Sequence, residues 1–161
     1  MTWSEERVTT ETVLWLKGKG WEVLAVHPPD GQGPFVVFRK PIRNRNERSS
    51  YHPDVVAIRP DPKFGLRVLI VESKGVESDL SSDIEKIEEL ANDNFALRWI
   101  VFKLRRVEGF GLSGFDYEGM TGIPVSDLPI QFLFAASGPV AKYRTFKIRD
   151  FDAEEIIFED V

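Results

Sequence analysis

The sequence contains no cysteine and only two histidines, His27 and His52, among its 161 residues. The absence of cysteine excludes disulfide bonds, thiolate zinc sites and a cysteine nucleophile. The scarcity of histidine argues against a zinc site built from several imidazoles. Any metal bound by this chain should therefore have oxygen ligands, which is the chemistry of Mg²⁺ or Mn²⁺.

Long apolar runs are also missing from the sequence. No segment has membrane-spanning length, and the N-terminal MTWSEERVTT lacks the pattern of a signal peptide. We therefore expect a cytoplasmic protein without a membrane partner. The length suits one domain. We expect a single domain over residues 1–161, with a core over about 4–104 and a β-rich extension over about 105–161.

The formal net charge of −5 does not by itself indicate a nucleic-acid partner, but the charges are unevenly distributed. One segment is basic and is opposed only by Glu47; its members are Arg39, Lys40, Arg43, Arg45 and Arg48. The residues after Arg149 include six acids and no base. A run of charge is often only a solvated face. The basic segment directly precedes the motif described below, so a DNA-binding role stays open beside the solvated-face interpretation.

Hydrophobic periodicity and breakers predict the elements of an α/β protein. Ser4 is a candidate N-cap for a helix over about 5–18, with Val8, Thr12 and Leu16 facing inward. Strands are predicted over about 21–27, 35–40, 54–60, 66–72, 95–104, 129–136 and 143–148. A second helix is predicted from Leu80 through Ala91, with its acids on the outer face. The nearly continuous apolar run at 95–104 is typical of a strand buried on both faces.

The order helix, strands, helix, strand predicts a mixed β-sheet with helices packed on its faces. The strand that follows the second helix should run parallel to the strand before it, as in a crossover connection. We expect residues 95–104 to be that strand.

Three ionisable residues stand at the adjoining ends of two apolar strands. A hairpin with its turn centred on Lys63 pairs residue 60 with residue 66 and places Asp54 opposite Glu72. Lys74 shares the face of Glu72 because side chains alternate along a strand. Two opposed carboxylates repel each other, and a divalent cation removes that repulsion. A metal, a water and a lysine together suit phosphodiester hydrolysis.

The residues Pro53-Asp54 followed by Glu72-Ser73-Lys74 resemble the motif of the PD-(D/E)xK nuclease superfamily, over about residues 4–104. The resemblance implies a restriction endonuclease-like core and a Mg²⁺-dependent DNA endonuclease, with Mn²⁺ as an alternative cofactor. It also implies that Asp54 and Glu72 ligate the metal and that Lys74 is the catalytic lysine. Two other Pro-Asp pairs, at 29–30 and 60–61, lie where no strand brings them to Glu72.

Many members of that superfamily add an acid from the first helix. The resemblance favours Glu5, and Glu11 is the rival because it neighbours Val8 and Trp15 at helical spacing. Some relatives carry a glutamine in the helix after the ExK motif. No glutamine occurs between 75 and 95 here, and Lys86 is the nearest polar candidate.

Other features allow alternatives to a nuclease. The G-x-G-x-x-G pattern within 109–115 lacks the helix that a dinucleotide-binding turn requires, so we expect a loop. His52 adjoins Asp54 and is a candidate contact for a phosphate. Because each chain has one site, cutting both DNA strands suggests a homodimer. The alternative functions are an inactive nuclease-fold DNA-binding or accessory subunit, and a protein-interaction module that uses the acidic C-terminal segment.

Overall fold

The computed structural model of the protein describes residues 2–27, 37–38, 50–107 and 123–161. Within these residues the protein is a mixed α/β structure built on a six-stranded sheet with the strand order β1-β4-β5-β6-β8-β7. The strands of this sheet are β1 (Glu22–Val26), β4 (Val55–Asp61), β5 (Gly65–Val76), β6 (Ile130–Gly138), β7 (Lys142–Ile148) and β8 (Phe151–Glu159). The short strands β2 (Val37–Phe38) and β3 (Ser50–Tyr51) form a separate antiparallel pair.

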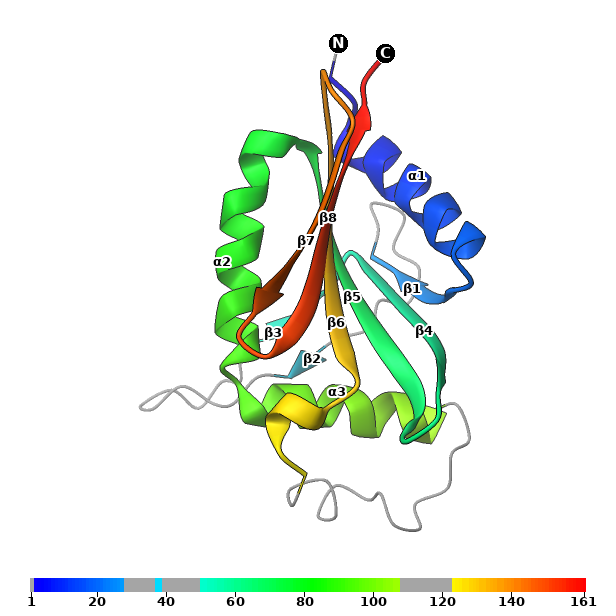
Figure 1. Cartoon of the computed structure of the whole chain (residues 1–161), viewed down its shortest axis with the longest axis vertical. Coiled ribbons are helices and arrows are strands. Elements are labelled where there is room, and N and C mark those ends of the chain that lie inside the picture. The colour runs from blue at the N-terminus through cyan, green and yellow to red at the C-terminus, as the bar shows by residue number, and fades with distance from the viewer. Residues whose placement is uncertain (1, 28–36, 39–49, 108–122) are drawn as a thin grey trace.

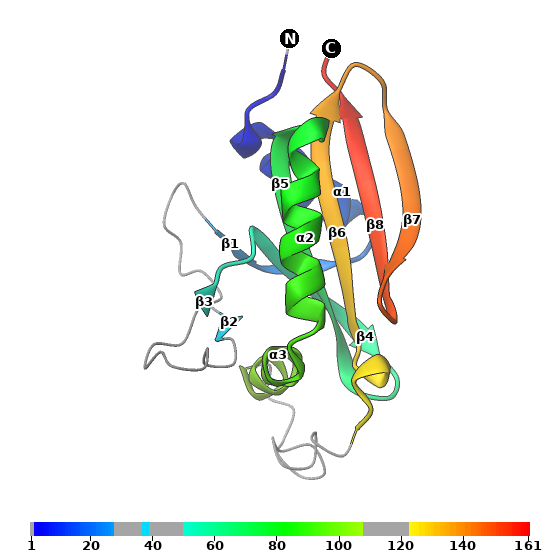
Figure 2. The same ribbon diagram turned by 90° about the vertical axis from the view of Figure 1, so that its left-hand side faces the viewer.

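Helices cover both faces of the sheet (Figures 1 and 2). Helix α1 (Glu5–Gly18) lies on one face, and α2 (Leu80–Ala91) and α3 (Asn94–Val107) lie on the other. The predicted start of α1 is confirmed, because the Ser4 hydroxyl accepts a hydrogen bond from the backbone N–H of Arg7 at 3.1 Å. No helix among the described residues is long and apolar enough to cross a membrane.

The central strand β5 divides the core into two layers. Val68 and Ile70 pack toward α2 and α3, whereas Leu69 and Val71 pack toward α1. Each of these side chains is at most 2% exposed. Burial of an aliphatic side chain of this size stabilises the fold by about 1.5–3 kcal/mol. The strand that carries the ExK motif is therefore held rigidly from both faces.

The predicted hairpin of β4 and β5 is confirmed in its register. Val55 pairs with Val71 and Arg59 pairs with Arg67, so the next position places Asp54 beside Glu72. Asp61 fixes the turn, because its Oδ2 accepts hydrogen bonds from the backbone N–H groups of Lys63 and Phe64 at 3.0 and 2.9 Å. Local turn chemistry thus sets the register that brings the two carboxyl groups together.

The prediction of a strand over 95–104 is wrong, because these residues belong to α3. Its buried hydrophobic residues are Ala96, Leu97, Ile100, Val101 and Leu104, which recur at helical spacing. Asp93 begins the helix, since its Oδ1 accepts a hydrogen bond from the backbone N–H of Ala96 at 3.0 Å. The many aromatic and β-branched residues concealed this periodicity.

The parallel partner of β5 is β6, and β6 in turn pairs in parallel with β8. The strands predicted near 129–136 and 143–148 therefore exist, but they extend the same sheet as the core hairpin. The acidic C-terminal segment forms β8, which lies between β6 and β7. Its acids pair across the sheet: Glu155 accepts two hydrogen bonds from Arg144 at 3.1 Å each. The sequence did not predict this strand.

Two predicted features lie outside the described residues. They are the basic segment (Arg39, Lys40, Arg43, Arg45 and Arg48) and the G-x-G-x-x-G pattern within 109–115. Their roles stay predictions.

Candidate active site

Asp54 stands just before β4, and hydrogen bonds on both sides fix its backbone. Its N–H donates to the carbonyl of Val71 at 3.1 Å, and its own carbonyl accepts from the N–H of His27 at 2.8 Å. Its Oδ2 accepts a hydrogen bond from the N–H of Ser73 at 2.8 Å. The side chain is therefore aimed at the ExK segment of the neighbouring strand.

Glu72 is 2% exposed and lies against Asp54 and Tyr51. The Tyr51 hydroxyl donates a hydrogen bond to Oε1 of Glu72. Burial, followed by the hydrogen bond and the charge of Asp54, raises the pKa of Glu72 to about 9. Glu72 is thus held in its protonated form at neutral pH, because a second buried negative charge beside Asp54 would be strongly repelled.

Lys74 stands at an irregularity in the pairing of β5 with β6. Ser73 pairs with Ala135 and Val76 with Ser137, so Lys74 and Gly75 oppose a single residue of β6. Such a bulge re-aims a side chain at the end of a strand. Burial alone would lower the pKa of Lys74, but the carboxyl groups of Asp83, Glu5, Asp54 and Glu72 together raise it. The ammonium group stays charged among them.

Asp83 of α2 joins this group from the helix above the sheet. It is 1% exposed, and its Oδ1 lies 3.7 Å from Nζ of Lys74 and 3.8 Å from Nζ of Lys86. Its Oδ2 is buried without a hydrogen-bond partner among the described residues. Lys86 also lies 3.9 Å from Oε1 of Glu72. The prediction that the acids of this helix face outward is therefore wrong for Asp83.

Sequence reasoning named Lys86 but missed Asp83 and Tyr51 as members of the site. A signal for Asp83 existed, because it falls between Leu80 and Ile87 on the inward stripe of α2. An ionisable residue on the buried stripe of an amphipathic helix requires a partner. No comparable signal marked Tyr51, whose position depends on the pairing of two short strands.

The first helix brings Glu5 toward the site. Burial raises the pKa of Glu5, and the charges of Asp54 and Asp83 raise it further, against the opposing effect of Lys74. Glu11 lies six residues farther along the helix, or about 9 Å, and no hydrogen bond or ion pair joins it to the site among the described residues. The hydroxyls of Thr9 and Ser73 are 2.7 Å apart and tie the first turns of α1 to β5.

Gly75 lets the chain ahead of α1 pass directly over the ExK strand. A Cβ at this position would lie 2.7 Å from the carbonyl oxygen of Trp3 and 3.5 Å from the backbone nitrogen of Glu5. Ser137 completes the contact, since its hydroxyl donates to the carbonyl of Gly75 at 2.5 Å and accepts from the N–H of Trp3 at 3.3 Å. The absence of a side chain at Gly75 therefore positions Glu5.

We expect Gly75→Ala to destabilise the protein by about 1–3 kcal/mol, because a backbone group has to move to admit the methyl group. Gly18→Ala is the matched control, since nothing lies within 4 Å of its Cβ position. That control should be neutral or slightly stabilising. Urea unfolding measures both changes, and equal stability of the two variants would contradict the close approach of Trp3.

His52 does not contact the carboxyl pair through any hydrogen bond seen among the described residues. Its ring stacks on His27, with centroids 5.2 Å apart and planes inclined by 10°. His27 leaves its Nδ1 buried without a partner among the described residues. The stacked pair borders the loop before Asp54.

The donor set of the site consists of oxygens. Among the described residues, no three histidine, aspartate or glutamate side chains gather closely enough to hold a metal by themselves. Mg²⁺, however, commonly binds one or two carboxylates and takes its other ligands from water and substrate phosphates. The raised pKa of Glu72 and the unpartnered Oδ2 of Asp83 both indicate closely spaced acidic groups whose repulsion a bound cation would relieve. The residues present fit a hard divalent ion.

A scan against protein-family models, a search of curated proteins and a search of solved structures found no match to this chain. The interpretation of the site therefore depends on its own geometry and on the motif resemblance.

Proposed function

We propose that this chain is a metal-dependent DNA endonuclease with a restriction endonuclease-like core, hydrolysing phosphodiester bonds at the Asp54, Glu72 and Lys74 site. The observation that carries the proposal is the register of β4 and β5, which brings the carboxyl groups of Asp54 and Glu72 together, with Lys74 and its partner Asp83 in the same group. A buried pair of carboxyl groups lowers the stability of the fold. Binding of a catalytic cation would explain why the protein has such a pair.

Each residue has a role in this proposal. Asp54 and Glu72 would hold Mg²⁺ or Mn²⁺, which when bound polarises a phosphoryl oxygen and lowers the pKa of water. Lys74 orients the attacking water or donates hydrogen bonds to the phosphate oxygens as their charge grows. Glu5 adds negative charge at the rim of the site.

The partner implied by this chemistry is DNA. The basic segment from Arg39 to Arg48 lies shortly before Asp54 in the sequence. We propose that it contacts DNA phosphates without reading bases. Because each chain carries one such site, cutting both strands of a duplex suggests a homodimer.

Cleavage of supercoiled plasmid and of a branched duplex tests the proposal. We expect cutting with Mg²⁺ or Mn²⁺, none with chelator, and none by Asp54→Ala protein purified in parallel. Asp30→Ala is the matched control, since it also removes the acid of a Pro-Asp pair. Cutting that persists in Asp54→Ala protein would reveal a contaminating nuclease.

The leading alternative, an inactive DNA-binding or accessory subunit, would give DNA binding without cutting on every substrate. Deletion of the acidic C-terminal segment does not isolate a role of its charges in protein interaction. Residues 151–159 form a strand inside the sheet, so removing them would unfold the sheet as well as remove the charges.

A further inference from the structure

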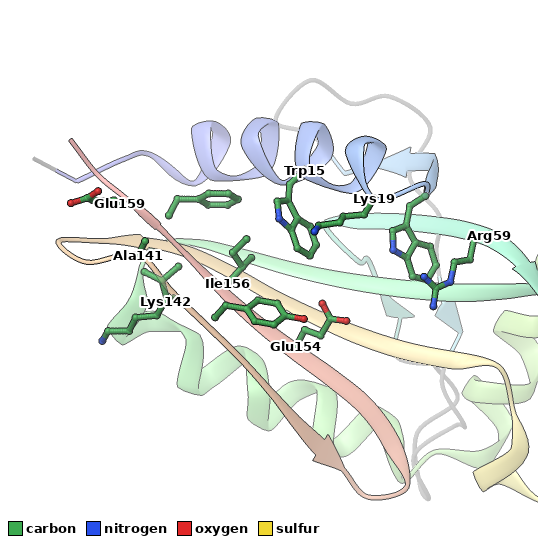
Figure 3. A pocket seen from close by; sticks show the side chains of 12 residues that line it. Trp15, Lys19, Arg59, Ala141, Lys142, Glu154, Ile156 and Glu159 are labelled. Carbon is green, nitrogen blue, oxygen red and sulfur yellow. The ribbon is translucent and has the colours of Figure 1, made fainter.

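A groove separate from the carboxyl pair runs along α1 on its face of the sheet (Figure 3). It has a volume of about 750 Å³, within the range of pockets that bind organic ligands. Trp15 of α1 and Lys19, directly after the helix, form one wall, and Lys142 and Tyr143 of β7 form the other. Ile156 of β8 lies on its floor.

Aromatic rings line the middle of this groove. The rings of Trp15 and Tyr143 pack against each other there, with centroids 6.5 Å apart and planes inclined by 45°. Tyr143 is 56% exposed, so much of its ring is accessible to a ligand. The groove therefore presents flat apolar surfaces on which a planar group can stack.

Two cations at one end of the groove have no carboxylate partner among the described residues. Lys19 lies over the ring of Trp15 at 5.6 Å, and Arg59 lies over the ring of Trp21 at 4.3 Å. Arg59 also stands directly opposite Arg67 on the neighbouring strand. Arg67 is itself paired with Asp61 at 3.2 Å, whereas Arg59 forms no ion pair with a described residue.

The other cation and the acids of the groove already have partners or lie at its ends. Lys142 donates hydrogen bonds to both carboxylate oxygens of Glu77 at 3.0 and 3.2 Å. Glu154 is hydrogen-bonded to Tyr143. Glu159 lies at the end of the groove opposite Arg59 (Figure 3). The charges in the groove that have no oppositely charged partner among the described residues are therefore those of Lys19 and Arg59, and they are positive.

The groove lies on the α1 face of the sheet, whereas the candidate active site includes Asp83 and Lys86 from α2 on the other face. The groove follows α1, whose first residue, Glu5, is at that site. The end of the groove opposite Arg59 reaches Lys142, which is hydrogen-bonded to Glu77 directly after β5. A DNA strand that reaches both the site and the groove therefore has to pass around this end of the sheet, where α1 begins and β5 ends.

We propose that this groove binds a short stretch of single-stranded DNA, with bases stacked on Trp15 and Tyr143 and phosphates at Lys19 and Arg59. Alternating aromatic and cationic side chains suit a single strand, whereas the bases of a duplex are already stacked on one another. The proposal deepens the nuclease function, on which it rests, by defining a substrate that has a single-stranded arm.

Fluorescence anisotropy of a labelled oligothymidylate of about ten nucleotides tests this inference, with wild-type protein in chelator so that no cutting occurs. We expect Tyr143→Ala to weaken binding about tenfold, since one stacked base contributes about 1–3 kcal/mol. Lys19→Ala and Arg59→Ala should weaken binding and flatten its salt dependence. A duplex of equal length should bind Tyr143→Ala and wild-type protein equally.

Lys103→Ala is the matched control, because Lys103 also lies over an indole, that of Trp99 at 6.0 Å, but belongs to α3 on the other face. The inference is overturned if wild-type protein does not bind the oligonucleotide, or if the groove variants bind as Lys103→Ala does. It is also overturned if sedimentation shows a dimer that Tyr143→Ala dissociates, since a second copy then fills the groove. These outcomes are independent of the plasmid assay, which tests cutting alone.

Discussion

Lys74→Ala is expected to lower kcat for DNA cleavage by about a hundredfold to a thousandfold, which is the usual cost of removing one charged donor from a transition state. KM should change little, because Lys74 is one cation at the centre of the site and the predicted phosphate contacts lie elsewhere. The measurement is steady-state cleavage of plasmid at saturating Mg²⁺. An equal loss in kcat and in DNA affinity would instead indicate a binding role.

Asp83 should act through Lys74. Its Oδ1 lies 3.7 Å from Nζ of Lys74, while its buried position keeps it from substrate. We expect Asp83→Asn to reduce kcat by about tenfold to a hundredfold, the range found for residues that orient catalytic groups. In a Lys74→Ala background the same change should have almost no further effect on kcat.

This double-mutant cycle separates positioning from simple stabilisation. Glu85→Gln is the control, because it removes an acid from the exposed face of the same helix. If Asp83→Asn costs the same factor with and without Lys74, then Asp83 does not position that lysine. The same four proteins are also compared by thermal unfolding. If Asp83 and Lys74 are in contact, their effects on stability are coupled even if the protein cuts no DNA.

The hairpin of β4 and β5 could be predicted from the sequence because its determinants are local. A turn with Asp61 at its start and alternating apolar residues on either side set the register that brings Asp54 to Glu72. The start of α1 was predictable for the same reason, since Ser4 caps it within three residues. The motif residues therefore came together as the sequence indicated.

The remaining fold depends on contacts between distant segments. Strand β8 is acidic, yet it is stable inside the sheet because Arg144 and Lys147 of β7 pair with its Glu155 and Asp152. The apolar pattern of residues 95–104 is compatible with either a strand or a helix. Packing of these residues against the sheet determines that a helix forms. Asp83 was overlooked because its partners lie on another element.

The stability of the protein in chelator should fall as pH rises from about 5 to 9, because of Glu72. Its pKa is raised from 4.5 to about 9 by burial and by Asp54. A carboxyl group with a raised pKa favours the folded state fully below its usual pKa, and this contribution is lost as pH rises toward the folded-state value. The slope from this one group is at most about 1.4 kcal/mol per pH unit.

Glu72→Gln should remove most of this slope, since the amide is nearly isosteric and does not ionise. Asp83 and Glu5 also have raised pKa values and contribute in the same direction, so a smaller slope should persist in the variant. Urea unfolding in chelator across this pH range makes the comparison. An unchanged slope in Glu72→Gln would mean that Glu72 is already ionised in the folded protein.

Addition of Mg²⁺ should reverse the trend in wild-type protein. A metal would bind the ionised carboxylates and displace the proton from Glu72, so its stabilising effect should grow as pH rises. Glu72→Gln should gain little from the metal at any pH. Equal stabilisation of both proteins by Mg²⁺ would locate the ion away from Glu72, and the buried pair would then need an explanation other than metal binding.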